Sequence, residues 1–266
     1  MTITMTETKQ QKLVRLLEKW PVTRACATAR EISQLTRVLM HVSFALRPGR
    51  FFVWRLLAAA GLPSEAVFVS GLTNPGRRIV LGPLFHDDLE FWRWFIDQGL
   101  TSRGGHLCSP TYNLIVRSRR FSVFTDASKR AVGGYCVETG RYFRYDFSDW
   151  QRARFVGSSR LVKEEDELSN SVLELFGMVM GVWLLVIRQQ HKSAEAGDCV
   201  FLRGDNEPSS AWIQRCREGS APRSGALVRL LGVMEVSSGW HFQASHVPGV
   251  LNSIADGMSR WESHEI

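Results

Sequence analysis

The sequence lacks any apolar run long enough to cross a membrane. Its most apolar stretch, LFGMVMGVWLLVI at residues 175–187, has 13 residues, whereas a spanning helix needs about 20. The first ten residues, MTITMTETKQ, contain no apolar core of the kind found in secretory signals. We therefore expect a buried helix at 175–187, no membrane partner and no secretion.

Paired cysteines are also missing. The 5 cysteines are odd in number and scattered, without a CxxC motif or a Cys/His cluster, which argues against a zinc site and against a disulfide framework. Reduced thiols are typical of intracellular proteins. We therefore expect a cytoplasmic or nuclear protein.

Acidic residues are few in the N-terminal part of the chain. Residues 1–60 contain ten Lys and Arg against three Glu, and this excess equals the whole net charge of +7. A basic segment joined to a neutral body suggests a polyanionic partner, with nucleic acid ahead of a membrane surface. A solvated basic helix face explains the same charges equally well.

The composition, 44% hydrophobic and 22% charged, is that of a globular protein, and 266 residues suffice for one large or two modest domains. Residues 1–60 predict helices, because Thr28 and Glu31 form a capping-box pattern before apolar residues at helical spacing. Residues 61–82 contain turn residues and a hairpin pattern. An amphipathic helix is expected at 85–100 and a linker at 101–110.

After residue 120 the pattern predicts an α/β domain with the element order β-β-β-α-β-α-α-β-α. Short apolar and aromatic runs between turn signals predict strands at 121–128, 133–140, 141–148, 199–206 and 240–246. Helical periodicity predicts helices at about 168–188, 207–217, 226–236 and 252–261. Between the third strand and the first of these helices lies a basic, polar stretch whose arginines could contact phosphates or simply be solvated.

Four carboxylates in this domain occupy positions where a buried acid needs a partner. Asp126 and Asp205 end apolar strands. Glu174 lies in the middle of an apolar helix, and Asp256 lies in the last helix. Each alone fits an ordinary role as a cap, an ion-pair partner or a solvated acid. Together they supply the hard oxygen ligands that Mg²⁺ or Mn²⁺ prefers, and two such ions about 4 Å apart can clamp a phosphodiester.

Two glycines share a helix face with Glu174. Gly177 and Gly181 follow it at i+3 and i+7, and glycine in a helix costs about 1 kcal/mol relative to alanine. A close approach of this helix to the sheet explains both glycines, and it would bring Glu174 near Asp126. The alternative is that the glycines only relieve crowding in a packing interface.

Four stretches occur in the order found in the ribonuclease H domain of retroelement reverse transcriptases: FTDAS, VLELFGMVMG, FLRGDN and HVPGVLNSIADGMSR. Over about residues 118–262 the sequence resembles that domain, most closely those of gypsy-like and DIRS-like retrotransposons. The resemblance implies a ribonuclease H-like α/β fold, with a five-stranded mixed sheet flanked by helices. It also implies a metal-dependent endonuclease that hydrolyses the RNA strand of RNA–DNA hybrids with two Mg²⁺ ions, or Mn²⁺ in their place.

The resemblance carries particular roles onto this chain. The family's four metal-binding and catalytic carboxylates correspond to Asp126, Glu174, Asp205 and Asp256. His246 matches the family's mobile histidine, which would shuttle a proton or assist product release; a solvated loop histidine is the alternative. Substrate contacts are expected from three polar residues beside the motifs: Ser128, Asn206 and Asn252.

Residues 1–110 resemble, less specifically, the thumb and connection region that precedes this domain in such polymerases. The sequence FHDD at 85–88 imitates the aromatic-x-Asp-Asp loop of a polymerase palm, but it opens an amphipathic helix, where acids complement the helix dipole. Without a palm, the chain is not expected to synthesise DNA by itself. The rest of a retroelement polyprotein is therefore an expected partner.

Other functions fit the same residues. One is a catalytically inactive nucleic-acid-binding remnant of a retroelement with the same fold. A second is a relative of integrases or resolvases, which the acid in the long helix disfavours because integrases lack one at that position. A third is an interaction module, on which the sequence gives no information. Cleavage of a labelled hybrid would separate these.

Overall fold

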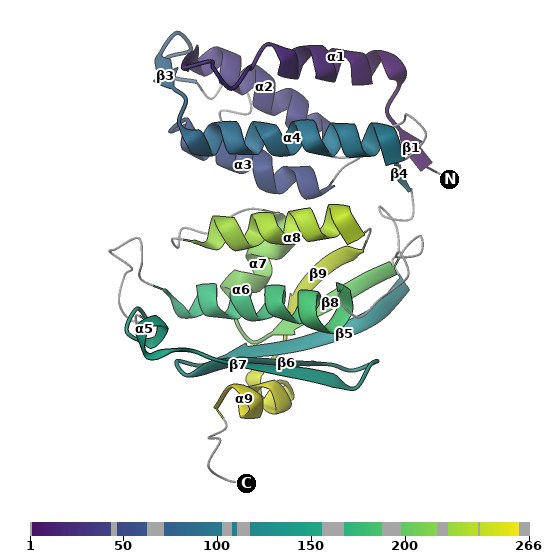
Figure 1. Ribbon diagram of the computed structural model, residues 1–266, viewed down its shortest axis with the longest axis vertical. Helices are drawn as coiled ribbons and strands as arrows, with labels where there is room; N and C mark the ends of the chain where they lie inside the picture. The colour runs from purple at the N-terminus through teal and green to yellow at the C-terminus, as the bar shows by residue number, and fades with distance from the viewer. Residues whose placement is uncertain are drawn as a thin grey trace. The chain divides into compact units, whose positions relative to one another are not determined.

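The computed structural model describes residues 2–43, 47–62, 72–102, 108–110, 118–155, 168–187, 198–216, 223–238 and 240–260. The chain divides into two compact units, Met1–Ile115 and Val116–Ile266. The elements of both units are labelled in Figure 1.

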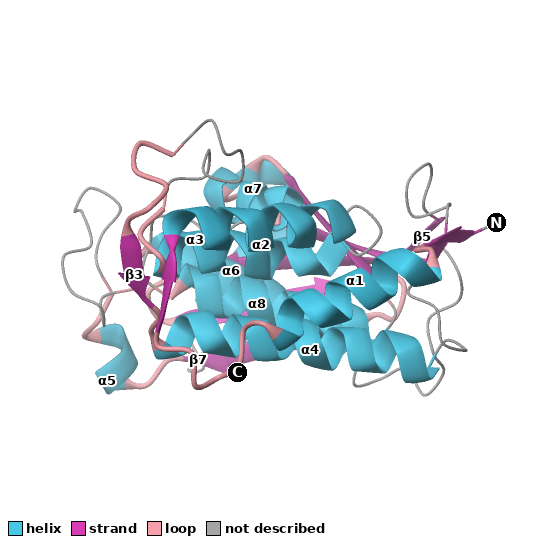
Figure 2. Cartoon of the chain, turned by 90° about the horizontal axis from the view of Figure 1, so that it is seen from above, coloured by secondary structure: helices cyan, strands magenta, loops and turns pink. Residues whose placement is uncertain are grey.

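The first unit is mainly helical (Figures 1 and 2). Its helices are α1 (Glu7–Glu18), α2 (Ala29–Val42), α3 (Arg50–Ala59) and α4 (Pro83–Ser102). Helix α3 packs against α2 and α4, while α1 packs against α4. The predicted capping box is confirmed, because the Thr28 hydroxyl accepts from the Glu31 amide and the Glu31 carboxylate accepts from the Thr28 amide. A 3₁₀ turn, η1 (Arg47–Gly49), precedes α3, where the sequence RPGR predicted a break.

Two short antiparallel sheets join distant parts of this unit. Strand β1 (Thr2–Thr4) pairs with β4 (Cys108–Pro110), and β2 (Cys26–Thr28) pairs with β3 (Arg78–Val80). The linker prediction for 101–110 is therefore wrong at both ends, since α4 continues to Ser102 and β4 forms a strand. A strand whose partner lies about a hundred residues away has no local signal. The hairpin pattern at 61–82 falls partly outside the described residues.

Asp88 corrects another expectation. Helix α4 begins at Pro83, so Asp88 lies beyond its first turn and does not complement the helix N-terminus. Its side chain is fully buried, with Oδ2 3.4 Å from Nε of Arg55 on α3. An ion pair between neighbouring helices, and not the helix dipole, explains why this acid is present.

The second unit contains the predicted five-stranded mixed sheet. Its strands are β5 (Ser118–Ala127), β6 (Ala131–Cys136), β7 (Arg141–Asp146), β8 (Asp198–Gly204) and β9 (His241–His246), in the order β7-β6-β5-β8-β9. The first three form an antiparallel meander, and β8 and β9 are parallel to β5. Side chains such as Val123, Val200 and Leu202 are completely buried, which makes β5 and β8 the centre of the core.

Helices lie on both faces of this sheet. They are α5 (Asp149–Arg152), α6 (Asn170–Gly181), α7 (Glu207–Arg215), α8 (Ser224–Ser238) and α9 (Ser253–Arg260). Figure 1 shows α6 and α8 on one face and α9 against the other. The long apolar helix predicted at about 168–188 is present as α6 followed by a π-helical turn, η5 (Val182–Val186). The one-turn helix α5 is an addition, capped by Ser148.

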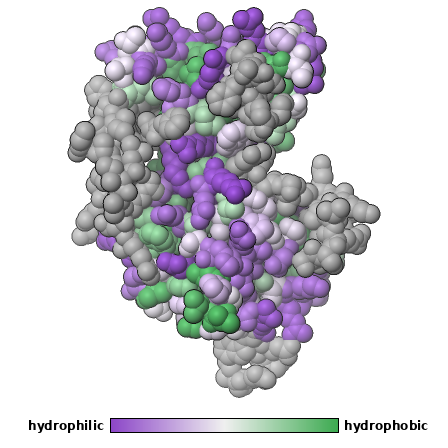
Figure 3. Space-filling model, turned by 180° about the vertical axis from the view of Figure 1, so that it is seen from behind, coloured by the Kyte–Doolittle hydropathy of each residue, from purple (hydrophilic) through white to green (hydrophobic). Residues whose placement is uncertain are grey.

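Some large apolar side chains of the described residues are exposed, among them Tyr142, Trp150 and Val250. On the face drawn in Figure 3, hydrophilic residues are interspersed with hydrophobic ones, and one group of hydrophobic residues lies near the lower end of the view. Within the described ranges, no helix combines the length and apolarity that a membrane crossing requires.

Candidate active site

Asp126 lies at the carboxyl end of the central strand β5. Because β5 and β8 are parallel, their carboxyl ends meet at the same edge of the sheet, which is where ligand sites form in α/β proteins. Asp205 follows β8 directly at this edge. The Asp126 side chain is 2% exposed, and the hydroxyl of Ser259 on α9 donates a hydrogen bond to its Oδ2.

Helix α6 brings Glu174 to the same edge. An added Cβ on Gly177 would lie 2.6 Å from Cγ2 of Val132, and one on Gly181 would lie 2.7 Å from Cγ1 of Val123. The predicted close approach of the helix to the sheet is therefore confirmed. Glu174 Oε1 accepts from the backbone N–H of Ala127 at 3.3 Å, which ties the carboxylate to the strand that carries Asp126.

The three carboxylates converge. One ligand oxygen from each of Asp126, Glu174 and Asp205 lies within 4.8 Å of the other two. Glu174 is 2% exposed, and its second oxygen, Oε2, is buried with no hydrogen-bond donor among the described residues. A buried carboxylate oxygen without a donor is costly, so the cluster is incomplete without a positively charged or hydrogen-bonding group.

Burial of the carboxylates, together with the repulsion between them, has the same consequence. Burial raises the pKa of Asp126 to about 6; the Ser259 hydrogen bond opposes this rise, while the charges of Asp205 and Asp256 add to it. Burial raises the pKa of Glu174 well above its usual value, with further contributions from Asp126 and Asp205. In both acids the charged form is therefore disfavoured relative to an ordinary carboxyl group, and a bound cation would compensate its charge.

Asp256 lies near this cluster without joining the group of three. Its side chain is partly exposed on α9 and forms an ion pair with Arg260, with 2.6 Å between Oδ1 and Nε. Its negative charge still contributes to the raised pKa of Asp126 and of Glu174. A metal-binding role for Asp256 stays a prediction.

His246 is the last residue of β9 and is exposed. Its Cα is paired with that of Gly204, the residue before Asp205, so the histidine belongs to the same edge of the sheet. The loop that follows turns back beside the cluster, because an added Cβ on Gly249 would lie 3.3 Å from Oδ2 of Asp205. Proton transfer by His246 stays a prediction.

The three residues expected to contact substrate have structural partners. Asn206 caps α7 by accepting from the backbone N–H of Ser209 at 3.0 Å. Asn252 is completely buried, and its Nδ2 donates to the carbonyl of Thr125 at 2.9 Å. Ser128 organises the turn between β5 and β6. These positions favour anchoring roles, and substrate contact by these residues stays untested.

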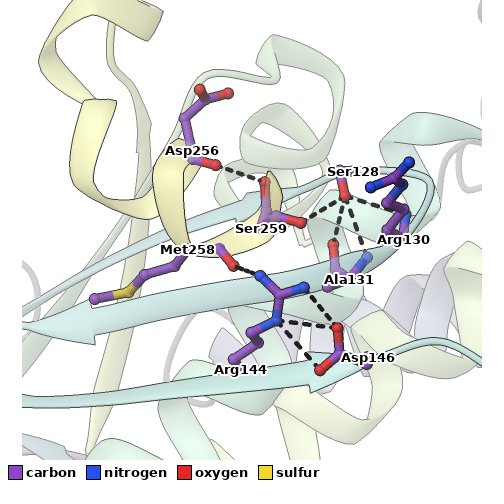
Figure 4. A network of polar contacts seen from close by, with 8 residues as sticks. All are labelled: Ser128, Arg130, Ala131, Arg144, Asp146, Asp256, Met258 and Ser259. Carbon is purple, nitrogen blue, oxygen red and sulfur yellow. Dashed lines mark hydrogen bonds and ion pairs between the residues drawn. The ribbon is translucent and has the colours of Figure 1, made fainter. Parts of the chain in front are cut away.

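Sequence reasoning missed two residues that organise the site. Ser259 is completely buried and binds Asp126. Arg144 on β7 donates to the carbonyl of Met258 in α9, as Figure 4 shows together with the neighbouring contacts. Ser259 had a weak local signal, since it lies one turn after Asp256 on the same helix. Arg144 had none, because it lies in an exposed-looking strand more than a hundred residues away.

The basic stretch after β7 lies mostly outside the described residues, including Arg160. Arg152 forms an ion pair with Asp149 at 2.7 Å. The Arg154 guanidinium carbon lies 3.6 Å from the ring centroid of Trp150. Phosphate contact by these arginines is untested.

The residues fit a divalent cation. All donors are carboxylate oxygens, which suit Mg²⁺ or Mn²⁺, and no thiol or imidazole belongs to the group of three. The donor-free oxygen of Glu174 and the raised pKa values are both relieved when a cation is bound.

The strand order, the pairing directions and the helices on both faces define a ribonuclease H-like fold for the second unit. At the carboxyl ends of its parallel strands this fold carries the acidic cluster of Asp126, Glu174 and Asp205.

Comparison with known proteins found similar structures at low identity. Ribonuclease H1 from the halophilic archaeon Halobacterium salinarum NRC-1 has 15% identity and a TM-score of 0.33, over 53% of this chain and 94% of that one. The foamy viral protease-reverse transcriptase dRH in complex with double-stranded DNA has 11% identity and a TM-score of 0.29, over 91% of this chain but 35% of that one. No family model matches the sequence. No curated protein matches it either. The fold assignment therefore rests on the strand order and pairing.

Proposed function

We propose that the second unit is a metal-dependent endonuclease that hydrolyses the RNA strand of RNA–DNA hybrids. The observation that carries this proposal is the convergence of Asp126, Glu174 and Asp205, two of them buried, within 4.8 Å at the edge of a ribonuclease H-like sheet. Such a cluster is strongly repulsive by itself, so a cation-binding function explains it better than a structural one.

Each residue has a defined task in this proposal. Asp126, Glu174 and Asp205 would hold Mg²⁺ or Mn²⁺ ions, with Asp256 as the fourth carboxylate. When bound, these ions would supply charge stabilisation to the phosphodiester and lower the pKa of a nucleophilic water. Ser259 fixes the orientation of the Asp126 carboxylate through its hydrogen bond. His246, exposed at the end of β9, would accept or deliver a proton near neutral pH.

The wider context of the chain forms part of the proposal. We place the chain in a retroelement reverse transcriptase polyprotein, in which residues 1–110 correspond to a thumb- and connection-like region and 118–262 to the ribonuclease H-like domain. The mainly helical first unit and the basic charge of residues 1–60 support a nucleic-acid-binding role for that region. Since FHDD lies within helix α4 and not between two strands, the chain by itself should not polymerise DNA.

The test is a cleavage assay with three labelled duplexes of one sequence: RNA–DNA hybrid, double-stranded RNA and double-stranded DNA, with Mg²⁺ or Mn²⁺. The wild type should cleave only the RNA strand of the hybrid, and Asp126→Asn and Asp205→Asn should abolish cleavage. Asp149→Asn makes the same chemical change at an acid whose side chain is 97% exposed, and should cleave like the wild type. Hybrid binding without cleavage would support the inactive remnant instead, and equal cleavage by the site variants would refute the assignment.

A further inference from the structure

Helix α9 is attached to the sheet through the carbonyl groups of its last turn. The last four carbonyls of any helix lack partners within it. In α9 the carbonyl of Met258 accepts from the Arg144 guanidinium, and the carbonyl of Ser259 accepts from the Ser128 hydroxyl at 2.7 Å. Figure 4 shows these two donors reaching the same turn from β7 and from the turn after β5.

Arg144 is itself held in place. Its Nη2 lies 2.6 Å from Oδ1 of Asp146, and its Nε donates to both carboxylate oxygens of that residue. The side chain is 20% exposed, so it lies between the strand and the helix. A planar guanidinium fixed on one side by a carboxylate presents its remaining N–H groups in a defined direction, which a flexible ammonium does not.

The helix also lies unusually close to the sheet. An added Cβ on Gly133 of β6 would lie 2.7 Å from Cβ of Met258 and 3.1 Å from the backbone N of Ser259. Gly133 is the strand partner of both Asp126 on β5 and Arg144 on β7. Asp126, Gly133 and Arg144 therefore lie side by side on three neighbouring strands. Gly133 is where α9 comes closest to the sheet, and Arg144 is hydrogen-bonded to α9.

We propose that Arg144 and Ser128 are positioning residues of the nuclease site, which set the place of α9 and thereby of Asp256 and Ser259. This inference rests on the proposed function. The side-chain contacts of Arg144 and Ser128 go to α9, to Asp146 and to the turn after β5, and within the described ranges none goes to the carboxylate cluster. Both act on the helix that carries the fourth carboxylate, and that helix also supplies the hydroxyl that orients Asp126. Loss of either contact should shift Asp256 while leaving Glu174 and Asp205, on other elements, in place.

A double-mutant cycle tests this inference. Arg144→Gln should lower kcat on the hybrid by about 10- to 100-fold, since a misplacement of about 1 Å can cost about 100-fold. It should also weaken Mn²⁺ binding measured by calorimetry without substrate. In the Asp256→Asn background the same substitution should lower kcat by a clearly smaller factor than in the wild type, because the part of its effect that passes through Asp256 is already lost. If Arg144→Gln lowers kcat by the same factor in the wild type and in the Asp256→Asn background, the proposal is overturned.

Two further variants separate positioning from loss of folding. Arg144→Lys keeps the positive charge and a single donor nitrogen, and it should be more active than Arg144→Gln. Ser128→Ala removes the other contact to the same turn and should act in the same direction as Arg144→Gln. Thermal unfolding followed by circular dichroism identifies the temperature range in which each variant is folded, and kcat is compared there.

The matched control is Arg141→Gln, the same chemical change at an exposed residue of the same strand. If the wild type cleaves and binds Mn²⁺ while Arg144→Gln behaves like Arg141→Gln, the positioning role is overturned and the proposed function stands. If the wild type neither cleaves nor binds Mn²⁺, the proposed function is overturned, and the positioning role with it.

Discussion

The close approach of α6 to the sheet gives a prediction whose size follows from the structure. In Gly177→Ala the new methyl group would lie 2.6 Å from Cγ2 of Val132, against at least 3.4 Å for an ordinary contact, so the helix must move by about 0.8 Å (3.4 minus 2.6). Val132 is completely buried and cannot give way easily. Overpacking of this kind costs about 1–3 kcal/mol, while alanine gains about 1 kcal/mol of helix propensity. The free energy of unfolding should therefore fall by about 1 kcal/mol.

Activity should respond more strongly than stability. A shift of this size displaces Glu174 from Asp126, and we expect kcat on the hybrid to fall at least about tenfold. Urea unfolding and hybrid cleavage measure the two effects. Gly257→Ala is the matched control, because an added Cβ there meets nothing within 4 Å, and it should stabilise by up to about 1 kcal/mol. A Gly177→Ala variant as stable and as active as the wild type would refute the reasoning.

Three further predictions concern stability. In the absence of divalent cations, the melting temperature should fall as pH rises from about 4 to above 6, because the raised pKa of Asp126, about 6, makes the folded state bind the proton more tightly than the unfolded state; a flat profile would contradict this. Asn252→Ala should lower the free energy of unfolding by about 1–3 kcal/mol, since it removes a buried donor to the Thr125 carbonyl; urea unfolding measures it, and an unchanged midpoint would be inconsistent. Thr28→Ala should lower the stability of the first unit by about 1 kcal/mol through loss of the capping box with Glu31, whereas an unchanged melting temperature would show that the cap contributes nothing.

The fold of the second unit was predictable because its elements have strong local patterns. Apolar strands separated by turn residues, and an apolar helix with glycines on one face, can be recognised from the local sequence without knowledge of what they pack against. The prediction of a linker at 101–110 is wrong because β4 forms only by pairing with β1, which lies at the other end of the unit in sequence. Asp88 was misassigned for a related reason: its partner, Arg55, lies on another helix, and burial of both cannot be read from spacing.

The candidate site was predictable in part. Asp126, Glu174 and Asp205 are recognisable in the sequence as acids in apolar surroundings, and the structure brings them together. Ser259 and Arg144 were missed because a serine in a short polar helix and an arginine in an alternating strand resemble surface residues. Their importance comes from contacts across more than a hundred residues of sequence, which one sequence does not contain.

The central claim is that the acidic cluster binds divalent cations, and calorimetric titration with Mn²⁺ at pH 7.5 tests it most directly. The wild type should bind, and Asp126→Asn should bind at least about tenfold more weakly, since loss of one carboxylate ligand removes both charge and a coordinating oxygen. Asp149→Asn should titrate like the wild type. Equal binding by Asp126→Asn and the wild type, or no binding by either, would contradict the account.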